Sequence, residues 1–285
     1  LYLGGYDIVG VYTQEPKKKF RGQKKYNTPV QQWAESQLLP VFTPKILDDT
    51  SLKEFQSLKP DVAILFAYGK IVPLNWLNTP LNGFINIHAS LLPKWRGAAP
   101  IQRAIINGDK KIGVSIMKIQ EKLDTGPILS SKQIDLDKNS THGEVEKKLS
   151  LIGADLLVES LKSIENGTLK FIEQASKDAT YAKKIDKKES KINWNLDANK
   201  VLAHVHGLSP SPGAWFNYEN ERFKVLKAQI SLKRGKQGSV IDENLTIACQ
   251  SNSIQILELQ RQGKNKQTAK EFLLGKKISK NTILK

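Results

Sequence analysis

The chain has 285 residues, 39% of them hydrophobic, which is enough for one large or two ordinary domains with a buried core. No apolar run approaches the roughly 20 residues of a membrane-spanning helix, and the single cysteine, Cys249, excludes an internal disulfide, so we expect a reducing compartment. Forty-four basic residues against 28 acidic ones give a formal net charge of +16, which favours a polyanionic partner such as nucleic acid. A generic lysine-rich surface would have the same composition and stays open as an alternative.

The first part of the chain alternates apolar strands with helices. A continuous apolar run of this kind indicates a strand buried on both faces, and strands separated by helices favour a parallel sheet. The pattern therefore predicts an α/β domain with a doubly wound, parallel, Rossmann-like sheet. The expected strands lie at residues 7–13, 41–42, 61–68, 84–88, 113–119 and 128–134, and the expected helices begin near Thr28, Thr50 or Ser51, Ala98 and Thr141.

The end of the chain has a different pattern. Residues 181–195 are polar and lysine-rich and read as an extended linker, whereas residues 196–285 contain short strands separated by turns. We expect these strands at 214–218, 222–230, 239–242, 245–249 and 254–259, which predicts a small β-barrel with the OB-fold as first choice. The predicted domains are thus 1–180, a linker at 181–195, and 196–285. The last of these holds 15 basic and 7 acidic residues, a net charge of +8.

A dense run of positive charge lies between the first predicted strand and the first capped helix. It is expected to form a loop, and such runs are commonly just solvated surface. Its place after a strand, at the sheet edge where α/β proteins bind ligands, equally favours contact with a large anionic substrate. The basic residues are Lys17, Lys18, Lys19, Arg21, Lys24 and Lys25.

Two polar residues end the predicted strand at 84–88. Successive strand side chains point to opposite faces, so Asn86 and His88 share one face and Ile85 and Ile87 the other. An isolated Asn-x-His is more often a capping or core polar pair than a functional site. Asp124, in Asp-Thr-Gly, would likewise be an ordinary turn residue if it stood alone.

The longer motifs carry a resemblance. Asn86-Ile87-His88, the segment Ser90 to Pro93, the segment at 95–100 (WRGAAP) and Leu123-Asp124-Thr125-Gly126 together resemble the folate-dependent formyltransferases. The likeness runs from residue 1 to near the end of the chain, and it is strongest at 84–129 and looser after 180. The Trp-Arg-Gly-Ala-Ala-Pro-Ile-Gln variant is narrower and points to members that act on an aminoacylated tRNA.

This resemblance implies transfer of a formyl group from 10-formyltetrahydrofolate to the amino group of methionyl initiator tRNA. It implies Asn86, His88 and Asp124 as catalytic residues. Acyl transfer to an amine needs two donors for the developing oxyanion, which Asn86 and His88 can supply, and His88 can then protonate the leaving nitrogen. Asp124 would hold His88 in its donor state and relay the proton of the amine through a water.

The binding residues are implied in the same way. Ser90, Leu91, Leu92 and Pro93 resemble the folate-binding segment, and Tyr68-Gly69 would form a second wall of that pocket. The basic loop would engage the acceptor end of the tRNA. We expect no metal, because His204-x-His206 lacks a third ligand. A monomer in the cytoplasm or an organellar matrix, with no membrane partner, is expected.

One strand and most of a helix precede residue 1 in the family, so the strand at 7–13 is expected to lack a neighbour, and an incomplete sequence is the favoured explanation. Two alternatives to the tRNA reaction remain open. The first is formyl transfer to a small amine, such as a sugar nucleotide or a ribonucleotide. The second is a non-catalytic, RNA-binding relative.

Overall fold

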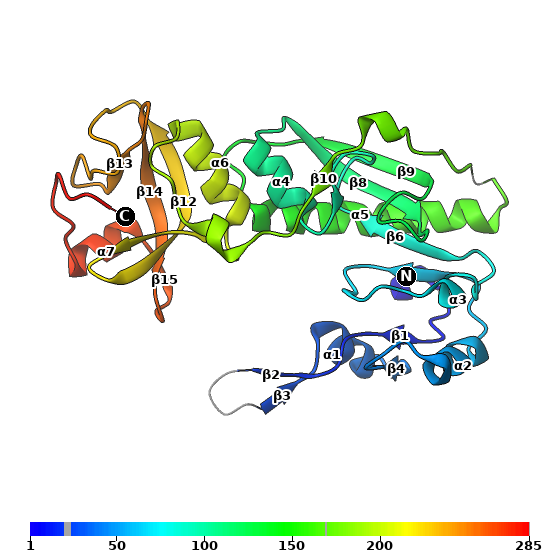
Figure 1. Cartoon of the computed structure of the whole chain (residues 1–285). Coiled ribbons are helices and arrows are strands. Elements are labelled where there is room, and N and C mark those ends of the chain that lie inside the picture. Colours follow the sequence, from blue (N-terminus) through cyan, green and yellow to red (C-terminus); the bar gives the residue numbers. More distant parts are fainter. Residues whose placement is uncertain (20–23, 169, 285) are drawn as a thin grey trace. The chain divides into compact units, whose positions relative to one another are not determined.

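The computed structural model describes residues 1–19, 24–168 and 170–284 (Figure 1). The chain divides into two compact units, each described here by itself. The first unit contains Leu1–His88, Ser115–Ser131 and Gly153–Ala175, and the second contains Ala89–Val114, Lys132–Ile152 and Ser176–Lys285. Among the described residues, no helix has both the length and the hydropathy that crossing a bilayer requires.

The main sheet has the strand order β5-β6-β8-β9. These strands are β5 (Ala63–Leu65), β6 (Phe84–His88), β8 (Lys111–Lys118) and β9 (Ile128–Asp135). Strand β6 runs parallel to β5 but antiparallel to β8. The predicted α/β class is therefore confirmed, whereas the prediction that all strands of this sheet run parallel was wrong. An apolar run identifies a buried strand, but it does not encode the direction of that strand.

A second, two-stranded sheet pairs β1 (Val11–Tyr12) with β4 (Val41–Phe42) in parallel. The helices of this region are α1 (Pro29–Ser36), α2 (Asp49–Ser57) and α3 (Leu74–Leu77), and a single 3-10 turn, η1, spans Tyr2–Gly4. The predicted cap of α1 is confirmed, because Thr28 Oγ1 accepts a hydrogen bond from Gln31 N at 3.1 Å. The cap of α2 is instead Asp48, whose carboxylate accepts from Ser51 N, so Ser51 is its third residue.

Aromatic side chains form the core of the first unit. Phe55 of α2 stacks on Trp76 of α3 with ring centroids 4.8 Å apart, and its ring centroid lies 5.8 Å from that of Phe84 at the start of β6; all three side chains belong to one buried cluster. Burying such rings contributes about 1.5–3 kcal/mol per side chain. This packing fixes the start of β6, and so the position of the polar residues at its end.

In the second unit, α4 (Pro100–Asn107) lies beside α6 (Ala198–Leu208), as Figure 1 shows. The helices approach closely at Gly207, where an added Cβ would stand 2.6 Å from Ile106 Cγ1. Short strands β7 (Arg96–Gly97) and β10 (Tyr181–Ala182) pair in parallel. The predicted linker at 181–195 therefore contains the strand β10 and a 3-10 turn, η3 (Lys187–Ser190), whereas another 3-10 turn, η2 (Ser176–Asp178), precedes it.

The C-terminal part is a curled antiparallel sheet of order β11-β12-β14-β13, with β15 paired to β14. Stacked Phe216 and Phe223 lie at its centre, and Cys249 is buried there, which raises the pKa of its thiol to about 12. Four of the expected strands are present, whereas 239–242 forms only isolated bridges. The elements are β11 (Ala214–Tyr218), β12 (Glu221–Ser231), β13 (Thr246–Ala248), β14 (Ser253–Arg261), β15 (Lys266–Thr268) and α7 (Ala269–Gly275).

The long helix α5 (His142–Glu165) begins with the predicted capping box. Thr141 N donates to Glu144 Oε2 at 2.8 Å, and Lys227 Nζ of β12 donates to Glu144 Oε1 at 2.8 Å. These bonds, that from Lys227 above all, lower the pKa of Glu144 to about 2. Because an unfolded glutamate titrates near about 4.3, this stabilisation is complete above that pH and is lost as the pH falls toward 2.

Glu144→Gln should therefore cost stability at neutral pH and cost progressively less in acid. The side chains of Glu144 and Lys227 are 52% and 38% exposed, so water weakens their ion pair. We therefore expect the variant to lose less than about 1 kcal/mol of unfolding free energy at neutral pH. Urea midpoints of the wild type and the variant, measured at about pH 6 and about pH 3, check this. A difference that stays constant between the two pH values would contradict the assignment.

Candidate active site

Strand β6 delivers Asn86 and His88 to one face of the main sheet. Both side chains are buried, with Asn86 9% and His88 6% exposed, whereas Ile85 on the opposite face is fully buried in the core. The register with β8 sets Asn86 opposite Met117 and His88 opposite Ser115. The shared face predicted from the sequence is thus confirmed, and the imidazole lies at the carboxyl end of its strand.

Asp124 approaches His88 from the loop between β8 and β9. Its Oδ2 lies 3.8 Å from His88 Nδ1, and the two side chains are 15% and 7% exposed. This distance suits an ion pair when the imidazole is protonated, and it is longer than a direct hydrogen bond. The structure therefore brings together two residues that are 36 positions apart in the sequence (124 − 88).

The backbone of the Asp124 loop is tightly constrained. Asp124 has φ +50°, a left-handed conformation that side-chain-bearing residues seldom adopt. At Gly126, an added Cβ would stand 1.8 Å from Lys118 O, so only glycine fits. Gln174, which no sequence pattern singles out, donates from Nε2 to Asp124 O at 3.0 Å and to Gly126 O at 2.6 Å.

The predicted folate-binding segment, Ser90 to Pro93, belongs to the second unit. Its loop is braced from several directions: Ser90 Oγ donates to Lys94 O at 2.6 Å, Trp95 N donates to Thr180 Oγ1 at 2.8 Å, and Trp95 Nε1 donates to Asp109 Oδ2 at 2.8 Å. Sequence reasoning missed Thr180 and Asp109, which carry no motif of their own. These hydrogen bonds hold the backbone of the loop in one conformation.

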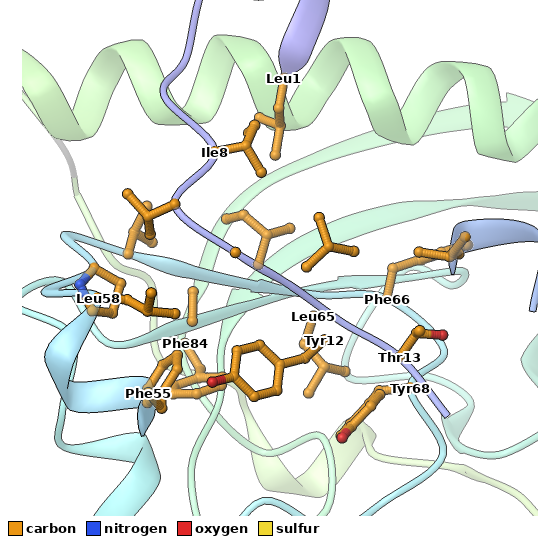
Figure 2. Close-up of a pocket in the computed structure, with 18 of the residues that line it drawn as sticks. Leu1, Ile8, Tyr12, Thr13, Phe55, Leu58, Leu65, Phe66, Tyr68 and Phe84 are labelled. Carbon is orange, nitrogen blue, oxygen red and sulfur yellow. The ribbon is translucent and has the colours of Figure 1, made fainter. Parts of the chain in front are cut away.

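Tyr68 and Gly69 follow β5 in the first unit. Gln14 Nε2 donates to Tyr68 O at 2.8 Å, and Gly69 has φ +76° with Gln14 packed against it. Tyr68 lines a cavity of about 780 Å³, shown in Figure 2 with its mainly apolar walls. Burial raises the pKa of Tyr68, and its hydroxyl has no hydrogen-bond partner among the described residues.

Both β1 and β5 contribute to the wall of this cavity, with Tyr12 from the one and Leu65 from the other (Figure 2). The backbone N–H groups of Val11 and Thr13 donate to carbonyls of the segment that contains β4. Because backbone groups alternate along a strand, the N–H and C=O of Tyr12 point to the opposite edge of β1. Within the described chain, β1 pairs with one strand, β4, on one of its two edges. Asn86, His88 and Asp124 do not line the cavity, so it is distinct from the polar site.

The basic segment is a hairpin rather than the expected loop. Strands β2 (Lys17–Lys19) and β3 (Lys24–Tyr26) pair antiparallel, with Lys18 opposite Lys25 and Lys19 opposite Lys24. A run of lysines has low strand propensity, which is why the sequence favoured a loop. Lys17 and Lys25 are exposed. Arg21 lies outside the described residues.

His204 and His206 lie on α6, each with a structural partner. His206 Nδ1 lies 3.2 Å from Lys138 O, and Ala228 N donates to His206 Nε2 at 3.3 Å. His204 Nε2 lies 2.8 Å from Glu189 O. Burial lowers the pKa of both rings, which favours neutral imidazoles that serve in packing.

Two family models match this chain. The formyl transferase model covers residues 3–161, and the model of the formyl transferase C-terminal domain covers 184–277. Together they span most of the sequence, and the resemblance inferred from the motifs is confirmed. The chain belongs to the formyl transferase family.

Its relatives include methionyl-tRNA formyltransferases. The chain is 46% identical to that of Pelagibacter ubique over 286 residues, covering 99% of this chain and 92% of the relative, and 44% identical to that of Brucella melitensis, covering 97% and 92%.

Similar solved structures include an N-formyltransferase of Helicobacter canadensis in complex with folinic acid and dTDP-3-aminofucose, with TM-score 0.67, 18% identity and 87% coverage of both chains. Another is the methionyl-tRNA formyltransferase of Clostridium thermocellum, with TM-score 0.55, 21% identity, and 72% and 88% coverage. At these identities the structures show the shared fold alone.

Proposed function

We propose that this chain transfers a formyl group from 10-formyltetrahydrofolate to the amino group of methionyl initiator tRNA. The observation that carries the proposal is the polar site of the first unit: Asn86 and His88 share one face of β6, and the Asp124 carboxylate stands 3.8 Å from the His88 ring. Membership of the formyl transferase family and relatives of 43–46% identity named for this reaction support it.

The folate supplies the formyl group. As the methionine nitrogen bonds to the formyl carbon, the formyl oxygen gains negative charge, and the amide of Asn86 and the imidazolium of His88 each donate a hydrogen bond to it. The bond to the folate nitrogen then breaks, and His88 donates its proton to that leaving nitrogen. Asp124 would orient the His88 ring as a donor and accept, through a water, the proton that the attacking amine loses. The products are formylmethionyl-tRNA and tetrahydrofolate, and these steps need no metal.

We also propose where the folate and the tRNA bind, using the residues that the sequence motifs indicated. Ser90, Leu91, Leu92 and Pro93 would hold the pterin through backbone groups and an apolar slot, with Tyr68-Gly69 as a second wall. The β2–β3 hairpin would grip phosphates of the acceptor arm, and the basic C-terminal sheet would add further tRNA contacts. We place the domain boundary near residue 180 and the reaction in the cytoplasm or an organellar matrix, with the enzyme acting as a monomer.

The acceptor distinguishes this function from its alternatives. We expect methionyl initiator tRNA to be formylated at a kcat/KM at least about 10³-fold above that of a small amine such as an amino-sugar nucleotide, because the binding energy of the tRNA positions the amine. Competition between the two acceptors for limiting formyl folate measures the ratio. Preference for the small amine would overturn the tRNA assignment, and transfer to neither would favour the non-catalytic alternative.

A further inference from the structure

The side-chain amide of Gln174 donates two hydrogen bonds to the backbone of the Asp124 loop. Its Nε2 carries two protons, which are enough for its bonds to Asp124 O at 3.0 Å and Gly126 O at 2.6 Å. These two carbonyls flank Thr125, so one amide clamps the turn on both sides. Gln174 itself is only partly buried.

The chain around Gln174 is anchored to the strand that follows the loop. Ile172 and Ile128 exchange both backbone hydrogen bonds, at 2.8 and 2.9 Å. Lys118 Nζ, at the other end of the loop, lies 5.7 Å from the ring centroid of Phe171. The backbone next to Gln174 is therefore held in place by β9, so the Gln174 side chain can restrain the Asp124 loop.

The loop needs such a clamp because its conformation is unfavourable by itself. A residue other than glycine in the left-handed region costs roughly 1 kcal/mol or more, and Asp124 has φ +50°. Thr125 Oγ1 and Lys122 O supply one further bond, at 3.0 Å. The direction of the Asp124 carboxylate follows from this backbone conformation.

We propose that Gln174 is a positioning residue for formyl transfer: by fixing the backbone at Asp124, it keeps the carboxylate facing His88 Nδ1. The inference rests on the proposed function, because it gives the His88–Asp124 pair a role in the reaction. That pair is separated by 3.8 Å, so a displacement of the loop changes how the carboxylate acts on the imidazole. A misplacement of about 1 Å in a catalytic group can cost about 10²-fold in rate.

Gln174→Met keeps the length of the side chain and removes the donors, and Gln174→Glu, of the same size, replaces them with an acceptor that repels the two carbonyls. We expect kcat for formylation of charged initiator tRNA to fall about 10–100-fold in both variants. The KM values for folate and tRNA should stay within about twofold. Gln56→Met, on the exposed face of α2, is the matched control and should keep wild-type kinetics.

A spectroscopic readout separates positioning from general structural damage. The chain has four histidines, so the ring nitrogens of His88 can be assigned by ¹⁵N NMR with an His88→Gln reference. In Gln174→Met the His88 signals should move toward those of Asp124→Asn, while those of His204 and His206 stay in place. Unchanged His88 signals, or a kcat within about twofold of wild type, would overturn the proposal.

The same variants distinguish a failure of the positioning role of Gln174 from a failure of the proposed active site. If His88→Ala and Asp124→Asn lose activity while both Gln174 variants retain it, only the positioning role is wrong. If His88→Ala and Asp124→Asn also retain activity, the proposed site itself is wrong.

Discussion

Replacing His88 by alanine is expected to lower kcat for formyl transfer by about 10²–10⁴, the usual contribution of a positioned acid–base group. The imidazole is both an oxyanion donor and the proton source for the leaving nitrogen, and alanine supplies neither. Asn86→Ala should lower kcat into a similar range through the lost oxyanion donor. Single-turnover formylation of charged initiator tRNA, with enzyme in excess, measures both.

A second histidine provides the control for this experiment. His204→Ala removes a ring whose contact is the carbonyl of Glu189, so formylation should stay within a few-fold of wild type. Circular dichroism should show that all the variants are folded. If His88→Ala also formylates within a few-fold of wild type, the catalytic assignment is wrong.

Neutralising the basic hairpin is expected to lower kcat/KM for charged tRNA by about 10²-fold or more at low salt and to leave folate affinity unchanged. The changes are Lys17, Lys18, Lys19, Arg21, Lys24 and Lys25, all to Gln. Each lost phosphate contact should reduce the log–log salt slope by up to about 0.9, so the six together should reduce it by up to about 5. Rates measured over a series of salt concentrations give this slope.

The control is an equal loss of charge elsewhere on the surface. The exposed lysines chosen are Lys53, Lys59, Lys147, Lys148, Lys162 and Lys170, again all to Gln. Because long-range attraction falls off within a Debye length of about 10 Å, these changes should affect the slope far less. Equal effects from both sets would mean that only net charge matters and that the hairpin is ordinary solvated surface.

The sequence located the candidate site at β6 because a strand has a strict two-residue period. Asn86 and His88 had to share a face, and apolar Ile85 had to face the core. Asp124 followed only from the family motif, because nothing in its local sequence predicts that a turn carboxylate will lie beside a histidine 36 residues earlier (124 − 88).

Other features depend on contacts that no local pattern encodes. Gln174 reaches Asp124 across 50 residues, and a lone glutamine after a helix carries no signal. The antiparallel direction of β8 is a tertiary property, because a buried apolar strand reads the same in either direction. The pairing of β2 with β3 went against the low strand propensity of lysine, which tertiary context commonly overrides.

The most direct measurement is transfer of isotopically labelled formyl from 10-formyltetrahydrofolate to methionyl initiator tRNA by the whole chain. The tRNA is then recovered, its aminoacyl ester is hydrolysed, and the released amino acid is identified by mass spectrometry. The account predicts labelled formylmethionine, with tetrahydrofolate formed in equal amount and with both products lost in the His88→Ala variant. Label that remains on the folate, or that appears on tRNA equally with His88→Ala, would contradict it.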